Sequence, residues 1–384
     1  MRRSLVRSSL GLPGAPPGFV CIARVLLIAV ALLSNAATAS ACSAQPVGQD
    51  DPIATIDARL HEHAEAGRFS GSVLIARGGE VLYRQGFGLS DREAGVANTE
   101  DTQFNICSMG KTFTAAAVML LVEEGRVDLN APISTYLPDF PVAMADQISV
   151  HNLLSHTSGL GNYMGHREFD RNMARLTAID QMYELVKQEE LKFPPGTRFS
   201  YANSGYVVLG KIIENASGQT YFDFVRARIF APLRMGATDF YLFSDRPEDV
   251  AFGYTRDGSG RLQREAHRAP NPASDGGVHS TLADLFAFDR ALHEATLLRA
   301  SSRDLMFTPN LNGYGYGLSI KPPDEHASER TSIGHTGGLM DRSTVLRHFI
   351  DDDTVIIVLS NFPAVAYEIA REIEAEMYGI EQAG

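Results

Sequence analysis

The sequence predicts an α+β fold in which one antiparallel β-sheet is flanked by helices and carries an inserted, mainly helical lobe. Three observations lead to this prediction. Strand-like patterns occur near both ends of the 384-residue chain, helix-like segments fill its middle, and a glycine pair joins the first two strand-like patterns. Strands from the two chain ends can share one sheet, which helices then cover. At this length we expect two packed lobes of one unit rather than a string of modules.

The first 41 residues have the composition of an export signal. Four arginines and no acidic residue accompany the apolar run Val25–Leu33, and small residues fill positions 37–41. We therefore expect an exported protein, located in the periplasm, anchored to the cell envelope or secreted. Cys42 has two interpretations: a lipid-modified cysteine that attaches the protein to a membrane, or the plain first residue after cleavage behind Ala41. We assign 42–52 to a linker.

The charge balance excludes one class of partner. The formal net charge is −12, and removal of the predicted signal leaves 30 basic against 46 acidic residues, a net charge of −16. Because nucleic acid binding needs a basic surface, we do not expect a nucleic acid partner. The only cysteines are Cys21, Cys42 and Cys107, and the first of them lies in the predicted signal, so a disulfide framework is not expected.

The first elements after the linker are a helix and a hairpin. Residues 53–66 repeat apolar side chains at helical spacing. Ser72–Ala76 and Val81–Gln85 read as strands, and Gly78-Gly79 between them tolerates the positive φ angles of a tight turn. Residues 53–128 and 283–380 together make up the predicted α/β lobe.

A second helix, Ser108–Glu124, is apolar nearly all round, so we expect it to be buried at the centre of the fold. Helix-like pieces separated by turns follow, and we assign 129–282 to the helical lobe. Strand patterns then return, and the acidic run Asp351–Asp353 links the last two as a polar hairpin tip. The predicted late elements are strands Gly315–Ile320, Thr331–His335, Thr344–Phe349 and Val355–Ser360, and a closing helix Ala364–Met377.

Ser108 and Lys111 stand three residues apart at the start of the second helix. This spacing places the hydroxyl and the amine on the same helix face, one turn apart. A serine hydroxyl needs a neighbouring base before it attacks a carbonyl, and a desolvated lysine near a helix N-terminus can act as that base. Free backbone N–H groups at the same terminus can stabilise an oxyanion. Taken alone, the pattern also fits an N-capping serine and a solvated lysine.

Two further motifs make the pattern specific. Tyr201-Ala202-Asn203 follows a Pro-Gly turn, and His335-Thr336-Gly337-Gly338 lies at the end of a predicted late strand. With S-x-x-K, these segments resemble, in order and rough spacing, the Y-x-N and K/H-T-G motifs of the serine beta-lactamase-related family. That family includes class C beta-lactamases, D-alanyl-D-alanine carboxypeptidases and esterases. The resemblance covers about residues 53–378, and further matching segments are 153–160, 195–197 and 275–280.

The resemblance implies a beta-lactamase/transpeptidase-like fold and a role for each motif residue. Ser108 would be acylated, and Lys111 and Tyr201 would share the tasks of base and acid. Asn203 would hold Lys111 and the substrate. The backbone N–H groups of Ser108 and Gly338 would form the oxyanion hole, within the substrate-binding segment His335, Thr336, Gly337 and Gly338. Water would release the acyl group, without any metal or organic cofactor.

One departure from the motif bears on the substrate. His335 stands where lactamases of the family usually carry lysine, so the cation that grips a substrate carboxylate is weakened or pH-dependent. This favours another hydrolase over a lactamase. The substrate alternatives are a peptidoglycan stem peptide, a small ester, a D-amino-acid amide and a beta-lactam. A different class of function, a non-catalytic sensor or binding protein with this fold, is the alternative to an enzyme.

Other polar residues have plainer explanations. We expect His156 to fix a turn through hydrogen bonds rather than to act as a base, and Cys107 to be a small buried filler. The segment His61-Glu62-His63 lacks the spacing of a zinc helix and reads as a solvated face. We expect a small-molecule or peptide substrate as the partner and no metal ligands.

Overall fold

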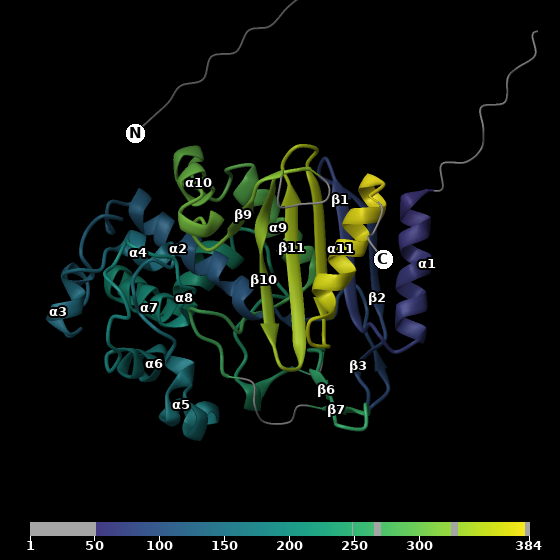
Figure 1. The fold of residues 1–384 in the computed structure, drawn as a ribbon, viewed down its shortest axis with the longest axis horizontal. Helices are drawn as coiled ribbons and strands as arrows, with labels where there is room; N and C mark the ends of the chain where they lie inside the picture. The colour runs from purple at the N-terminus through teal and green to yellow at the C-terminus, as the bar shows by residue number, and fades with distance from the viewer. Residues whose placement is uncertain (1–50, 248, 265–269, 324–328, 381–384) are drawn as a thin grey trace, which may run out of the picture. The chain divides into compact units, whose positions relative to one another are not determined.

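A six-stranded antiparallel sheet joins the two ends of the chain (Figure 1). Its strand order is β2-β1-β12-β11-β10-β9, so the first hairpin pairs directly with the last strand. The computed structural model describes residues 51–247, 249–264, 270–323 and 329–380; the predicted export signal and Cys42 lie outside them. The strands are β1 (Gly71–Arg77), β2 (Glu80–Phe87), β9 (Ser319–Lys321), β10 (Ser332–Leu339), β11 (Arg342–Phe349) and β12 (Thr354–Ser360).

The sheet confirms the predicted hairpins and corrects two strand boundaries. Gly78 and Gly79 turn between β1 and β2 with φ angles of 58° and 80°, and 351–353 joins β11 to β12. The strand predicted to begin at Gly315 begins only at Ser319, because Gly317 has a φ of 71° that a strand does not accommodate. The strand predicted to end at His335 continues to Leu339, paired throughout with β11.

Helices cover both faces of the sheet. α1 (Pro52–Glu65) and α11 (Val365–Tyr378) pack on one face, and α2 (Lys111–Glu123) and α9 (Leu282–His293) on the other. Strand alternation divides the core accordingly: Val73 and Ile75 of β1 face α1 and α11, whereas Leu74 faces α2. Pro52, assigned to the linker from sequence, is the first residue of α1 and follows the N-cap Asp51.

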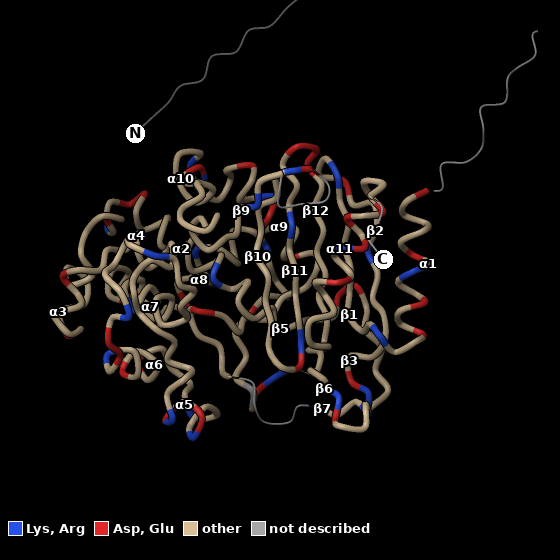
Figure 2. The backbone as a smooth tube through the Cα atoms, viewed as in Figure 1, with Lys and Arg blue, Asp and Glu red and all other residues tan. Residues whose placement is uncertain are grey.

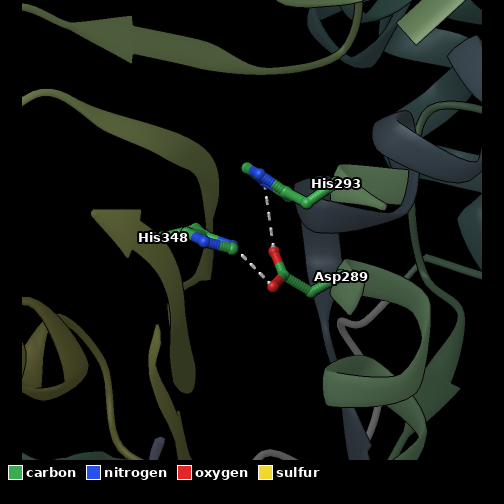
Figure 3. Close-up of side chains that lie close together, drawn as sticks. All are labelled: Asp289, His293 and His348. Atoms are coloured by element: carbon green, nitrogen blue, oxygen red, sulfur yellow. Dashed lines mark hydrogen bonds and ion pairs between the residues drawn. The ribbon is translucent and has the colours of Figure 1, made fainter. Parts of the chain in front are cut away.

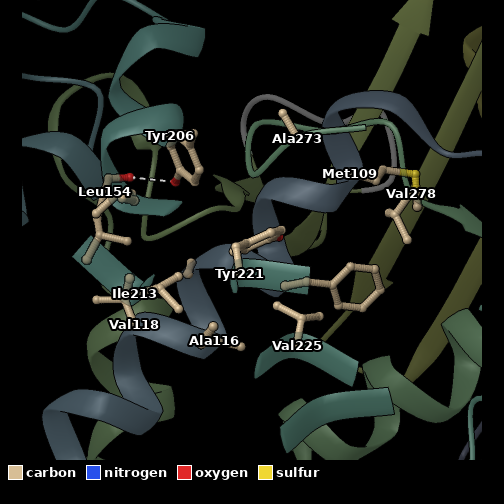
Figure 4. Close-up of a cluster of buried hydrophobic side chains, with 14 of the residues drawn as sticks. Met109, Ala116, Val118, Leu154, Tyr206, Ile213, Tyr221, Val225, Ala273 and Val278 are labelled. Atoms are coloured by element: carbon tan, nitrogen blue, oxygen red, sulfur yellow. Dashed lines mark hydrogen bonds between the residues drawn. The ribbon is translucent and has the colours of Figure 1, made fainter. Parts of the chain in front are cut away.

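The middle of the chain is mainly helical, as predicted. Its core is continuous with that beneath the sheet, as Met109, Val118, Ile213 and Tyr221 show (Figure 4). The remaining helices are α3 (Val142–Ala145), α4 (Val150–Leu154), α5 (Arg167–Asn172), α6 (Ile179–Val186), α7 (Asn203–Ser217), α8 (Tyr221–Val225) and α10 (Ala300–Met306). Short helical turns are η1 (Cys107–Gly110), η2 (Ile133–Thr135), η3 (Tyr163–Gly165), η4 (Met173–Arg175), η5 (Arg226–Phe230), η6 (Phe243–Asp245) and η7 (Leu311–Gly313).

Three two-stranded pairs complete the fold. They pair β3 (Leu89–Asp91) with β4 (Val96–Ala97), β5 (Phe104–Asn105) with β8 (His279–Ser280), and β6 (Tyr254–Arg256) with β7 (Leu262–Arg264). Acidic and basic residues are interspersed along the described elements (Figure 2). No helix among the described residues combines the length and the apolar composition that a membrane crossing requires.

Candidate active site

Ser108 lies in a tight turn at the entrance to the most buried helix. The predicted helix Ser108–Glu124 is in fact the 3₁₀ turn η1 followed by α2, which begins at Lys111. Cys107, just before Ser108, has a φ of 52°, an uncommon conformation for a residue with a side chain. Cys107 is buried, as predicted, and burial raises the pKa of its thiol to about 12. The turn thus fixes Ser108 at the end of a rigid helix.

The amine of Lys111 contacts three oxygen atoms. Its Nζ lies 3.2 Å from Ser108 Oγ, 2.8 Å from Asn203 Oδ1 and 2.5 Å from the backbone oxygen of Asp275. The residue is completely buried. The amide and backbone oxygens accept hydrogen bonds only. Lys111 Nζ therefore donates to these two oxygens, and they orient the amine towards its third contact, Ser108 Oγ.

Tyr201 and Asn203 meet Lys111 from the start of α7. Asn203 is the first residue of α7, and Lys111 Nζ lies 5.0 Å from the centre of the Tyr201 ring. Tyr201 is 41% exposed, which leaves it open to a substrate. The structure thus brings Ser108, Lys111, Tyr201 and Asn203 together, although they come from two segments of the chain.

The ring of His156 packs against the ring of Tyr201. The ring centres of His156 and Tyr201 are 4.3 Å apart, and His156 Nδ1 accepts a hydrogen bond from the backbone N–H of Ala202 at 3.2 Å. Burial, together with the charge of Lys111, holds the pKa of His156 well below its usual value. His156 thus lies against the tyrosine as a neutral ring and fixes the turn, as predicted.

The third motif lies within β10. His335 is buried, its Nδ1 donates to the backbone oxygen of Thr336 at 2.6 Å, and its Nε2 accepts from the Tyr314 hydroxyl at 2.9 Å. These partners assign the ring proton to Nδ1, because a carbonyl oxygen only accepts. Burial and then the charge of Lys111 lower the pKa of His335 to about 3. The residue is therefore neutral at physiological pH, and Thr336 beside it is exposed.

Beyond His335 one edge of β10 has no sheet partner among the described strands. β9 pairs only with Ser332–Gly334, and β10 continues past it to Leu339. Gly337 allows this edge to approach η1 closely, since a Cβ atom there would lie 2.2 Å from the backbone oxygen of Ile106. An unpaired strand edge offers backbone N–H and C=O groups to a ligand. Gly338 is exposed and lines the same pocket as Ser108.

A pocket opens beside Ser108, and we call it the acyl pocket. Tyr163, Met164, Asn203 and Gly338 contribute to its wall. The remaining lining residues are Asn105, Cys107, Ser108, Pro270, Asn271, Asp275, Gly276, Gly277 and Leu339. Lys111, Tyr201, His335 and Thr336 are not among them, although the three residues that Lys111 Nζ contacts are.

Two neighbours of the motif residues had no role assigned from sequence. The Asp275 carboxylate is buried and accepts hydrogen bonds from the Tyr163 hydroxyl at 3.1 and 3.3 Å; burial raises its pKa, and Lys111 opposes the shift. Tyr314 holds His335. The segment 275–280 was a sequence signal for Asp275, but Tyr314, which directly precedes the predicted strand Gly315–Ile320, gave none.

A separate buried cluster joins α9 to the far end of β11 (Figure 3). His348 Nδ1 lies 2.8 Å from Asp289 Oδ2, its Nε2 lies 2.9 Å from Asp353 Oδ1, and the His293 ring stacks on it at 3.6 Å. Asp289, His293 and His348 have the residue types of a metal site. Burial alone would lower the pKa of His348, but Asp289 and Asp353 raise it above its usual value. With a carboxylate at each ring nitrogen, the arrangement suits a protonated His348.

Comparison with known proteins identifies the family. Residues 54–375 match the family model described as Beta-lactamase, and the chain belongs to this family. It is 31% identical over 321 residues to penicillin-binding protein 4* of Bacillus subtilis, covering 77% of this chain and 69% of that protein. It is 34% identical over 223 residues to esterase EstB of Burkholderia gladioli, covering 52% and 54%. The solved structure of D-amino acid amidase from Ochrobactrum anthropi, bound to D-phenylalanine, superposes with a TM-score of 0.73 at 25% identity, covering 86% and 99%.

Proposed function

We propose that this protein is a serine hydrolase that forms an acyl-enzyme on Ser108 and hydrolyses a small ester or amide. The observation that carries the proposal is the three-fold contact of Lys111 Nζ with Ser108, Asn203 and Asp275. Two acceptors orient the amine so that the third contact falls on the hydroxyl to be deprotonated. Such pairing of a nucleophile with an oriented base is the arrangement that covalent catalysis needs.

The steps follow from the positions of the groups. The Ser108 hydroxyl gives its proton to the Lys111 amine as Oγ bonds to the substrate carbonyl. The negative charge that develops on the carbonyl oxygen is accepted by the backbone N–H groups of Ser108 and Gly338. Lys111 and Tyr201 then return the proton to the leaving group. A water molecule then attacks the ester carbonyl on Ser108 and gives a proton, through Tyr201, to the Lys111–Tyr201 pair. The pair passes this proton to Ser108 Oγ as the bond between Oγ and the acyl carbon breaks and the acid leaves.

The neutral state of His335 favours an ester or amide substrate over a beta-lactam. A beta-lactam carries a carboxylate that a cation in the third motif grips in lactamases, and a neutral imidazole held by Tyr314 supplies no such charge. Esterase and amidase relatives fit the same expectation. Carboxypeptidase action on a peptide substrate is the next candidate, since a relative is a penicillin-binding protein.

Export is a separate part of the proposal. The arginines, the apolar run and the small residues of the first 41 positions support delivery to the cell envelope. Lipid attachment at Cys42 would fix the protein to a membrane there. Palmitate labelling of the full chain and of Cys42→Ala, expressed in a bacterium that processes lipoproteins, tests this: the label on wild type alone supports it, and no label on either contradicts it.

The catalytic proposal is tested by steady-state hydrolysis of p-nitrophenyl butyrate, a D-amino-acid amide and a penicillin. Wild type should turn over the ester or the amide faster than the penicillin, and Ser108→Ala should turn over none of them above background. A folded wild type that is labelled once by each reagent and never recovers would instead be a sensor. A Ser108→Ala protein with undiminished turnover would place the nucleophile elsewhere.

A further inference from the structure

A second, smaller pocket shares part of its wall with the acyl pocket, and we call it the arginine pocket. It is lined by Asn105, Tyr241, Leu242, Arg246, Pro270, His279 and Arg342. Asn105 and Pro270 line both pockets, so these residues form the boundary between them. Asn105 is fixed there, because its Oδ1 accepts from the Cys107 backbone N–H at 2.9 Å and its Nδ2 donates to the Gly277 backbone oxygen at 3.3 Å. Both contacts tie the boundary to the residues next to Ser108.

Two guanidinium groups line this pocket, and Arg246 gives it a positive charge. The charge of Arg342 is offset by its ion pair with the Asp341 carboxylate. Arg246 lies over the Phe252 ring, and none of the described carboxylates forms an ion pair with it. Burial, with the charges of Arg342 and Arg264, lowers the pKa of Arg246 to about 10. Arg246 therefore stays charged at neutral pH in surroundings that favour an anion.

His279 adds a polar group without a partner. It is 5% exposed, its ring lines the pocket, and its Nδ1 has no hydrogen-bond partner among the described residues. Burial and the two arginines lower the pKa of His279 to about 3, so the ring is neutral and one of its nitrogens carries a proton. Buried polar atoms are usually paired. A bound anion would pair this nitrogen, provided that the imidazole proton resides on Nδ1.

The arginine pocket lies next to the acyl pocket, where we place the acyl part of a substrate. The leaving group must reach Lys111 and Tyr201, which supply its proton, and neither residue lines the acyl pocket. The part of the substrate that stays on Ser108 therefore occupies the acyl pocket. A long acyl chain bound there would have to pass Asn105 and Pro270 to reach Arg246 and His279 on the other side of the shared wall.

We infer that the arginine pocket binds a carboxylate at the far end of the substrate's acyl group, with Arg246 as the principal cation and His279 as a hydrogen-bond donor. The substrates would then be esters or amides of an acid that carries a second, terminal carboxylate. This inference rests on the proposed function, since it requires acyl transfer to Ser108. It makes Arg246 a specificity-determining residue.

The test compares matched pairs of activated esters. Mono-p-nitrophenyl esters of adipic, pimelic and suberic acid each carry a free terminal carboxylate, and their methyl esters of equal length do not. For wild type, kcat/KM should be at least tenfold higher for the free acid than for the methyl ester at one or more chain lengths. High salt should reduce this ratio, because it screens the charge on Arg246.

Variants of pocket residues test whether the arginine pocket causes the preference for a free acid. Arg246→Gln should reduce the ratio of the two kcat/KM values to about one, and Arg246→Lys should retain part of it. Leu242→Glu, which places a carboxylate in the pocket without removing Arg246, should also abolish the ratio if Arg246→Gln fails to fold. Arg59→Gln on α1, which pairs with Glu376 far along the chain, should keep the wild-type ratio.

The outcomes separate this inference from the proposed function. Wild type that hydrolyses every methyl ester but shows no preference for a free acid overturns the inference alone. A preference that survives both Arg246→Gln and Leu242→Glu overturns it as well. Wild type that hydrolyses none of the six esters, and is not labelled on Ser108, overturns the proposed function itself.

Discussion

Lys111 links the residues of the site, because its amine is hydrogen-bonded to both Ser108 and Asn203. Its amine is buried and is held by two acceptors whose positions come from α7 and from the segment around Asp275. Removal of the amine leaves Asn203 Oδ1 and the Asp275 backbone oxygen without this donor, and in the proposed mechanism it also leaves Ser108 without a base.

Lys111→Ala is expected to lower kcat for an ester substrate by about 10²–10⁴-fold, the usual contribution of general acid–base catalysis. Stopped-flow measurement of p-nitrophenol release measures this directly. Lys187→Ala is the matched control, since Lys187 pairs with Asp139 and Glu184 at the surface. A Lys111→Ala enzyme with kcat within a factor of three of wild type would show that another group is the base.

The motif residues were predictable from sequence, and their supports were not. Ser108 and Lys111 are close because they share one turn, which spacing alone encodes. His156 and Tyr314 reach the site only through the fold, and nothing local in their segments indicates a contact with Tyr201 or His335. The cation expected to be weakened at His335 is absent at neutral pH, because burial, which sequence does not reveal, keeps the ring neutral.

At the scale of elements, the close approach of β10 to η1 sets the distance between Ser108 and Gly338. Gly337 permits this approach: an added Cβ would lie 2.2 Å from the Ile106 backbone oxygen and 2.5 Å from Thr344 Oγ1. Thr344 Oγ1 itself donates to the Ile106 backbone oxygen at 3.1 Å. The strand edge and the nucleophile turn are thus linked through one crowded contact.

Gly337→Ala is expected to push β10 away from η1, with a loss of about 1–3 kcal/mol in the free energy of unfolding, typical of overpacking, and a larger proportional loss of kcat than of substrate affinity. Urea denaturation and steady-state kinetics measure the two effects. Gly236→Ala is the control, because nothing lies within 4 Å of its added Cβ. Equal stability and kcat in both variants would show that the contact does not position the oxyanion site.

Helices and strands were predicted well where their patterns extended over several residues. The buried helix α2 and the hairpin β1–β2 follow from apolar content and a glycine pair. The start of the strand predicted from Gly315 was wrong. Residues 314–318 are rich in apolar side chains but form a loop, because Gly317 has a positive φ angle that a strand does not accommodate. Hydrophobic runs do not distinguish a strand from a buried loop.

At the scale of the whole molecule, buried histidines couple stability to pH. Burial lowers the pKa values of His279 and His335 to about 3 and of His293 to about 4, and it lowers that of His156 as well. Each is neutral when folded, so each contributes stability above pH 6.5 that is lost as pH falls towards its folded pKa. His348, whose pKa is raised, acts in the opposite direction and contributes less as pH rises through that value.

With His151, whose pKa is also lowered by burial, the described histidines with lowered values outnumber the one with a raised value, so the free energy of unfolding should fall between pH 7 and pH 5. Each neutral histidine adds up to about 1.4 kcal/mol per pH unit to this slope well below pH 6.5. Urea denaturation at pH 7, 6 and 5 measures the slope. His279→Asn should make it shallower and the exposed His61→Asn should not; a slope that is flat, or equal in all three proteins, contradicts the account.

The central claim is that Ser108 becomes covalently acylated and is then released by water. Time-resolved intact-mass spectrometry after mixing with p-nitrophenyl butyrate tests it most directly. Wild type should gain the mass of one butyryl group within the first turnover and lose it as substrate is exhausted, while Ser108→Ala stays unmodified throughout. A butyryl adduct of equal yield on Ser108→Ala, or turnover by wild type with no adduct on Ser108 under acid quench, would contradict the claim.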